Sequence, residues 1–176
     1  MEIGPGFKET LVLADGGEVQ LRLVAETDGP AFVAGLELCS DRTIYNRFMG
    51  TKPRFSDSEL RYLTRVDPDH HVAIVGFQTG KLVAVGRMVR YAHRADAADF
   101  GLIVADAWQG NGLGKHLLNR LTDAAKERGI SYLCGEMFAT NTAMFALVDG
   151  HPYYTDWILD GSTASFEIDL RSPKSG

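Results

Sequence analysis

The sequence predicts an α/β fold, with a mixed and largely antiparallel twisted sheet of about seven strands flanked by about four helices. Three observations support this fold class. Short apolar or alternating runs recur along the chain and are separated by glycine-containing turns. Amphipathic stretches with helical spacing lie between some of these runs. A glycine-rich turn joins one apolar run to the longest predicted helix.

The composition indicates a single compact domain. The 176 residues are 45% hydrophobic and carry a formal charge of −5, which suits one domain with a full core. We expect that domain to span residues 1–176, with a core at about 19–170, an N-terminal hairpin at 8–24 and a frayed tail at 171–176. Cys39 and Cys134 follow no metal or redox spacing and are expected to be buried free thiols.

The charge and the absence of long apolar runs bear on partners and location. An acidic balance without a basic run argues against nucleic acid as a partner. No apolar run has membrane-spanning length, and the first residues lack the pattern of a signal peptide. We therefore expect a cytoplasmic protein without a membrane partner.

The first elements are a hairpin and a helix. Thr10–Leu13 and Val19–Val24 are strand-like runs joined by a glycine-containing turn. A helix is predicted over Asp28–Leu38, because Asp28 can cap it and Pro30 falls in its first turn. Its inward-facing residues are expected to be Phe32, Val33 and Leu36.

Two further segments precede the central strands. Ser40–Gly50 is interpreted as a second helix, with an alternative role as a lining of an acceptor pocket. Ser56 and Glu59 have capping-box spacing and start another helix, whose apolar face carries Leu60 and Leu63.

His71–Phe77 and Lys81–Arg90 are predicted to form a second hairpin. Adjacent residues on a strand point to opposite faces. His70 and His71 are therefore not expected to share a metal ion, and they are interpreted, with His93, as solvated residues near strand ends.

The strand over Ala97–Val104 leads into the glycine-rich turn. Asp99 is its only charge, either as a functional carboxylate or as a strand-end residue in water. Gly101 indicates a bulge or the close approach of another group. A helix is predicted from about Gly112 to Arg128, with Leu117 and Leu121 among its buried residues.

The glycine turn is an anion site by its chemistry. Glycines allow a ligand to approach the main chain, and the first amides of a helix are free donors. A P-loop is excluded because His116 stands where Ser or Thr should bind magnesium. A dinucleotide-binding loop is excluded because no G-x-G-x-x-G spacing is present. The pattern is instead Q-x-x-G-x-G, formed by Gln109, Gly112 and Gly114. The alternative interpretation is a glycine-rich strand-to-helix turn that binds no ligand.

The last elements follow the long helix. Tyr132–Phe138 is a predicted strand that contains Glu136, and Thr140 or Asn141 can cap a short helix over residues 142–148. Residues 153–159 and 164–170 form a final hairpin, followed by the expected tail. The predicted order is β β α α β β β α β α β β.

These features together resemble the GNAT superfamily of N-acetyltransferases, over most of the chain. The segments "FSDSELRYLTRVD" and "ADFGLIVADAWQGNGLG", the Tyr-x-Arg-Phe of residues 45–48 and the closing "FEIDL" are similar to bacterial Pat-type protein lysine acetyltransferase domains. The resemblance implies acetyl-CoA (coenzyme A) as cofactor and an acceptor amine as substrate, and either a monomer or a homodimer.

The resemblance also implies residue roles. Backbone groups of Ile103 and Val104 would bind the pantetheine arm, and Asn141 would contact the cofactor near its thiol. The pyrophosphate would be held at the loop, by the residues Gln109, Gly110, Asn111, Gly112, Leu113, Gly114 and Lys115.

A carboxylate would take the amine proton, with Asp99 as first choice and Glu136 as second. Relatives often carry glutamate at the position of Asp99, so the shorter aspartate implies a bridging water to the amine. They also often carry a tyrosine that acts as general acid at the position of Val148, so another group or solvent would protonate the leaving thiolate here. Tyr153 and Tyr154 lie close to Val148 in sequence and are candidates for this proton donor.

The predicted function is transfer of an acetyl group from acetyl-CoA to a primary amine, with a protein lysine as the leading acceptor. A small-molecule amine is the second possibility, favoured by a deep acidic pocket. A non-catalytic module that binds or senses acyl-CoA is the third.

Overall fold

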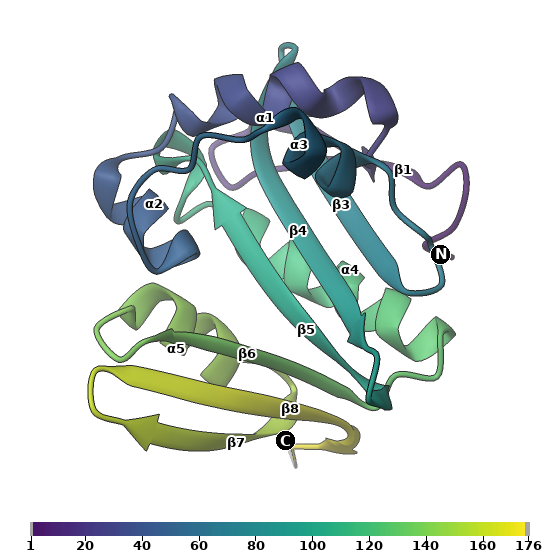
Figure 1. Cartoon of the computed structure of the whole chain (residues 1–176), viewed down its shortest axis with the longest axis vertical. Coiled ribbons are helices and arrows are strands. Elements are labelled where there is room, and N and C mark those ends of the chain that lie inside the picture. Colours follow the sequence, from purple (N-terminus) through teal and green to yellow (C-terminus); the bar gives the residue numbers. More distant parts are fainter. Residues whose placement is uncertain (1, 175–176) are drawn as a thin grey trace.

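The computed structural model describes residues 2–174, shown with labelled elements in Figure 1. The strands are β1 (Lys8–Val12), β2 (Glu18–Leu23), β3 (His71–Gln78), β4 (Lys81–Tyr91), β5 (Arg94–Val104), β6 (Tyr132–Phe138), β7 (Tyr153–Asp160) and β8 (Thr163–Pro173). The helices are α1 (Gly29–Leu36), α2 (Asp41–Phe48), α3 (Asp57–Thr64), α4 (Leu113–Glu127) and α5 (Thr142–Asp149), and short 3-10 turns (Glu26–Asp28 and Asp106–Trp108) stand before α1 and α4.

The strands form one mixed sheet in the order β1-β2-β3-β4-β5-β6-β8-β7. Every neighbouring pair is antiparallel except β5 and β6, which are parallel. The predicted fold class is confirmed, although the described residues contain eight strands and five α-helices, slightly more than predicted. The predicted order places two helices before β3, whereas the structure has three there, α1, α2 and α3. Ser40 caps α2 and Ser56 caps α3 through their side chains.

The sheet separates into two parts between β5 and β6. These strands pair only at Ala97–Asp99 with Tyr132–Cys134, and Figure 1 shows them diverging beyond that point. Where they separate, the rings of Phe100 and Phe166 pack edge to face with centroids 5.4 Å apart. The second half of β5 therefore has β4 on one edge and, within residues 2–174, no strand on the other.

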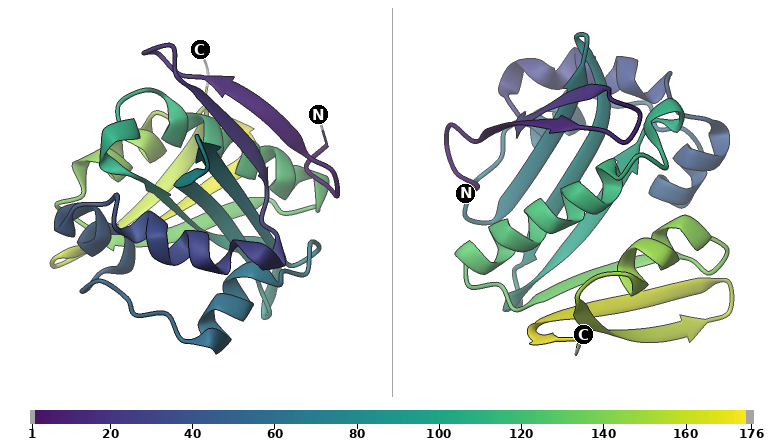
Figure 2. Two further views of the ribbon diagram at one scale, coloured as in Figure 1. Left: turned by 90° about the horizontal axis from the view of Figure 1, so that it is seen from above. Right: turned by 180° about the vertical axis from the view of Figure 1, so that it is seen from behind.

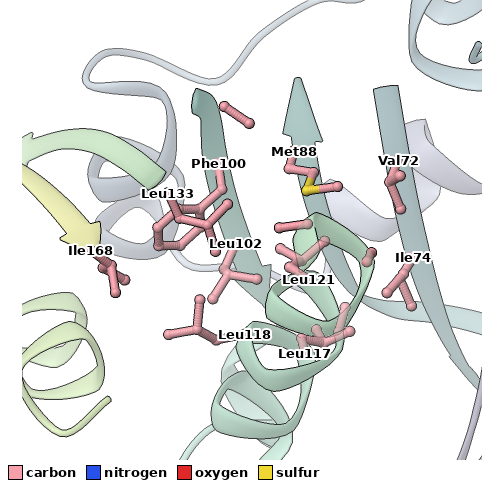
Figure 3. Close-up of a cluster of buried hydrophobic side chains, with 14 of the residues drawn as sticks. Val72, Ile74, Met88, Phe100, Leu102, Leu117, Leu118, Leu121, Leu133 and Ile168 are labelled. Atoms are coloured by element: carbon pink, nitrogen blue, oxygen red, sulfur yellow. The ribbon is translucent and has the colours of Figure 1, made fainter. Parts of the chain in front are cut away.

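One face of the sheet packs against α4, which crosses it in the rear view of Figure 2. Leu117, Leu118 and Leu121 are at most 1% exposed, and Figure 3 shows them facing side chains of β3, β4 and β5. The same cluster includes Leu133 and Ile168 from beyond the split. This shared core links the two parts of the sheet, and burying each such side chain contributes roughly 1.5–3 kcal/mol.

The other face is covered by α1 and α3, with Phe32, Val75 and Leu82 at its centre. The prediction that Val33 faces inward is wrong, because this residue is 47% exposed. Phe32 and Leu36 are one helical turn apart and face the sheet, whereas the next residue is rotated by about 100°. No described helix has both the length and the apolar character that a membrane crossing requires.

Three other predictions need correction. His71 is not a solvated strand-end residue: it is 6% exposed and its ring contacts the Arg87 guanidinium. Strand β5 begins earlier than predicted, at Arg94. The predicted tail begins as strand, because β8 continues to Pro173; residues 175–176 lie outside the described residues.

Candidate active site

A groove of about 640 Å³ lies at the split in the sheet. Its walls come from α2, the second half of β5, the glycine loop with the start of α4, the strand β6 and α5. The predicted site residues that line it are Asp99, Ile103, Val104, Gln109, Gly110, Gly112, Gly114, Lys115, Glu136 and Asn141. Of the remaining predicted residues, Leu113 is buried in the core and the Asn111 side chain approaches the Gln109 carbonyl.

The glycine loop forms one end of the groove. Gly110 and Gly112 have φ angles of +75° and +88°, a region that other residues rarely adopt, and an added Cβ at either would meet no atom within 4 Å. The first helical hydrogen bond of α4 runs from the His116 N–H to the Gly112 carbonyl. The preceding amides therefore have no helical acceptor and can bind an anion.

Gln109 fixes the loop to the end of β5. Its side-chain amide donates to the Val104 carbonyl at 2.8 Å and to the Thr43 hydroxyl at 3.0 Å. The motif glutamine thus joins the strand, the loop and α2, and its visible role is to shape the groove.

Asp99 of β5 and Glu136 of β6 both line the groove. Asp99 pairs with Cys134 in the parallel register, and Glu136 follows two residues later on β6, so both side chains share one face of the sheet. Desolvation by the groove walls raises the pKa of the Asp99 carboxyl, the Arg47 charge opposes this rise, and Glu136 adds to it. Both carboxylates remain exposed to the groove, so a substrate can reach them.

Arg47 of α2 lines the groove, in agreement with the alternative role given to its segment, although it was not among the predicted site residues. A Cβ built on Gly101 would lie 2.7 Å from its Nη2, so the guanidinium rests against the backbone of β5. The close approach predicted at Gly101 is therefore confirmed, and the approaching group is Arg47. The contact joins a strand glycine to an arginine on a helix that is distant in sequence. A single sequence cannot reveal such a contact.

Asn141 has a structural role beside its place in the groove. Its side-chain oxygen accepts from the Met144 N–H at 3.2 Å and caps α5, as predicted. Val148, at the position where a tyrosine was considered, is fully buried in the core. Tyr153 contacts Lys126 and Tyr154 is 56% exposed, and neither is among the described residues that line the groove.

The model of the acetyltransferase (GNAT) family matches residues 39–148 of the chain. Acetyltransferase Pat of Mycolicibacterium smegmatis is 31% identical over 112 residues, which are 62% of this chain and 33% of that protein. Acetyltransferase PA5475 of Pseudomonas aeruginosa is 29% identical over 136 residues, which are 75% of this chain and 73% of that protein.

Among solved structures, the GNAT domain of S. lividans PAT superposes with a TM-score of 0.87 at 28% identity. The superposition covers 96% of this chain and all of that domain. The chain therefore matches a complete domain in one relative, and only a third of the length of the Pat protein of M. smegmatis.

Proposed function

The chain belongs to the acetyltransferase (GNAT) family, whose members use acetyl-CoA as the acetyl donor, and from this premise we propose that it acetylates lysine side chains of proteins. The observation that carries the proposal is the pair Asp99 and Glu136 on the wall of a groove that begins at an anion-binding loop. Similarity to Pat-type domains supports a lysine acceptor. The exposure of the groove residues also favours a protein segment over an enclosed small amine.

The groove residues fit coenzyme A. The loop at Gly110 and Gly112 leaves open space and free amides for a pyrophosphate. The edge of β5 at Ile103 and Val104 has no described strand beside it and offers main-chain groups to an amide-bearing arm, although the Val104 carbonyl already accepts from Gln109. When bound, acetyl-CoA supplies an activated acetyl group; the protein groups position the reactants.

The proton of the acceptor amine is the main chemical obstacle. A lysine amine has a pKa near 10.4, and its neutral form at pH 7 costs about 4–5 kcal/mol. We assign the removal of this proton to Asp99, directly or through water, with Glu136 as the second candidate. The raised pKa of Asp99 makes its carboxylate a better proton acceptor than an ordinary aspartate.

Two measurements test this function. Calorimetric titration with acetyl-CoA should show one-to-one binding, and incubation with lysine-containing proteins should release free thiol with acetyl groups appearing on lysine. Thiol release only with small amines would replace the protein acceptor by a small-molecule one. Binding without thiol release for any amine would identify a non-catalytic acyl-CoA-binding module.

A further inference from the structure

Two arginines meet beside the groove, on the sheet face that α1 and α3 cover. The register of β4 and β5 places Arg87 opposite Gly101, and Arg47 of α2 lies against Gly101. Asp99 is two residues along β5 from Gly101, on the same face of the sheet. The groove is therefore lined by two carboxylates and by the guanidinium of Arg47, and Arg87 lies behind Arg47 in the adjoining cavity.

Within residues 2–174, neither arginine forms an ion pair with a carboxylate. Arg87 is 7% exposed; it donates to the Leu63 carbonyl at 2.8 Å and contacts the ring of His71, both of them uncharged partners. Among residues 2–174, Arg47 takes part in no hydrogen bond or ion pair, and its guanidinium lies 5.4 Å from the Phe48 ring centroid. A desolvated cation without an anionic partner is unfavourable, so this is a site that gains from an incoming anion.

Arg47 can be reached by a ligand in the groove. With Phe48 and Ile103 it lines both the groove and an adjoining apolar cavity of about 80 Å³ beneath α1. The guanidinium thus forms part of the partition between the two spaces. Its planar fork of donors suits a carboxylate, which it can bind through two parallel hydrogen bonds.

We propose that Arg47, reinforced by the neighbouring charge of Arg87, binds a carboxylate that the acceptor carries close to its reacting amine. The amine goes to Asp99 and Glu136, and the carboxylate goes to the arginines, so the groove sorts the two charges of one substrate. The inference rests on the proposed function, because it specifies the acceptor of that reaction. The carboxylate has two sources, an acidic side chain flanking a lysine or the main-chain carboxylate of a free amino acid.

A purely structural role for Arg47 would require a partner that holds its charge. Asp99 is the candidate for that partner, since its charge acts on the Arg47 guanidinium, but the two form no ion pair. Gly101 also lacks the side chain that would otherwise occupy this place, which keeps the guanidinium against the strand at the level of the groove.

The test uses matched ligands that differ by one charge. One set consists of single-lysine peptides with Asp or Glu beside the lysine, each paired with its Asn or Gln counterpart. The other compares free lysine with lysinamide. Binding to the protein saturated with coenzyme A is measured by calorimetry, and acetyl transfer is measured separately by thiol release.

We expect the ligand with the carboxylate to bind about ten-fold tighter than its amide counterpart. Arg47→Gln should abolish this difference, and Arg47→Lys should retain part of it. Arg42→Gln, an exposed charge change on the same helix, should leave it intact. Discrimination within the peptides identifies a flanking acidic side chain, and discrimination only between lysine and lysinamide identifies a free amino acid.

Equal affinities within every pair would overturn the inference, as would a preference that survives in Arg47→Gln. Each comparison is made within one folded variant, so altered stability does not imitate the result. Thiol release without any carboxylate preference would leave the proposed function standing alone. A binding preference without thiol release would support the carboxylate site and refute the proposed catalysis.

Discussion

At the residue scale, Asp99 is placed to act on a proton. Its neighbours are an apolar groove wall, a second carboxylate and a guanidinium that does not pair with it. Desolvation raises its pKa, which increases its affinity for a proton, while its exposure leaves it open to the acceptor. These properties make Asp99 the residue whose replacement tests the chemistry most directly.

We predict that Asp99→Ala lowers kcat by about ten-fold or more, because the proposed general base is lost. The dissociation constant for acetyl-CoA, measured by calorimetry, should stay nearly unchanged. In the wild type, kcat/KM should fall as the pH drops through the raised pKa of Asp99, since protonation removes the base. Glu136→Gln serves as the comparison, and a larger loss there than in Asp99→Ala would exchange the two assignments.

Gly101 and Arg47 provide a second prediction. A methyl group on Gly101 would collide with the Arg47 guanidinium, so we expect Gly101→Ala to destabilise the protein by about 1 kcal/mol. In an Arg47→Ala background the same change should be neutral or stabilising by about 0.5 kcal/mol, because alanine is then better than glycine in a strand. Urea unfolding of the four proteins measures the coupling. Additive effects would show that the two residues do not press on one another.

Individual residues were predicted with mixed success, for physical reasons. Asp99 and Glu136 could be proposed from strand positions and do line the groove. His71 and Val33 were misplaced, because burial depends on which side of an element a neighbour covers. The segment with Arg47 was considered as a pocket lining only as an alternative, and the contact of Arg47 with Gly101 was not predicted, because it depends on how α2 packs over β5, which local sequence does not encode.

At the scale of single elements, the turn before α4 combines two requirements at one point. Its glycines must adopt positive φ angles, and the first amides of the helix must stay accessible. Gly129, at the other end of the same helix, has φ +68° and equally open surroundings, but it is not among the groove residues. A side chain at either glycine would strain the backbone, but only one at Gly112 would also exclude a ligand from the groove. Comparing the two positions therefore distinguishes backbone strain from ligand exclusion.

We predict that Gly112→Leu abolishes acetyl-CoA binding in a calorimetric titration, because the side chain would occupy the anion site. Gly129→Leu should lose a similar amount of stability, roughly 1–2 kcal/mol, and retain binding. Loss of binding in both variants would attribute the effect to a weakened helix. Retained affinity in Gly112→Leu would remove the loop from the cofactor site.

Elements were predicted better than single residues. The limits of β6 were predicted in full, and α4 was predicted to within a residue at each end, because apolar periodicity and terminal glycines mark them. Strand β8 extends beyond its prediction, because Pro173 at its end pairs with Tyr153 of β7. Pairing partners distant in sequence decide where such a strand ends.

At the scale of the whole molecule, stability depends on a core that joins both parts of the sheet, and a buried histidine lies next to it. His151 is 4% exposed, and its Nε2 lies 3.0 Å from the Thr122 hydroxyl, which donates to the Leu118 carbonyl. The hydroxyl therefore accepts from Nε2–H, and Nδ1 is left buried without a partner. Desolvation, with nearby lysines, lowers the pKa of His151 to about 4.

We predict that the free energy of unfolding falls as the pH drops from about 6.5 to about 4. In that range the unfolded state binds a proton at residue 151 that the folded state excludes, and the loss is of the order of 2 kcal/mol. Because His71 also has a pKa of about 4, His151→Gln should flatten the dependence in part. The exposed His93, replaced by Gln, is the control for removing a histidine at the surface. An unaltered profile in His151→Gln would contradict the assignment.

The separation of β5 from β6 also bears on the tendency of the protein to aggregate in concentrated solution. A row of backbone N–H and C=O groups without a partner is a template for a strand from another chain, the usual start of aggregation. Here α2 and α5 flank that row and narrow the approach to it. A bound coenzyme would cover the same edge. Preparations stored with coenzyme A should therefore stay clear and monodisperse for longer than preparations stored without it.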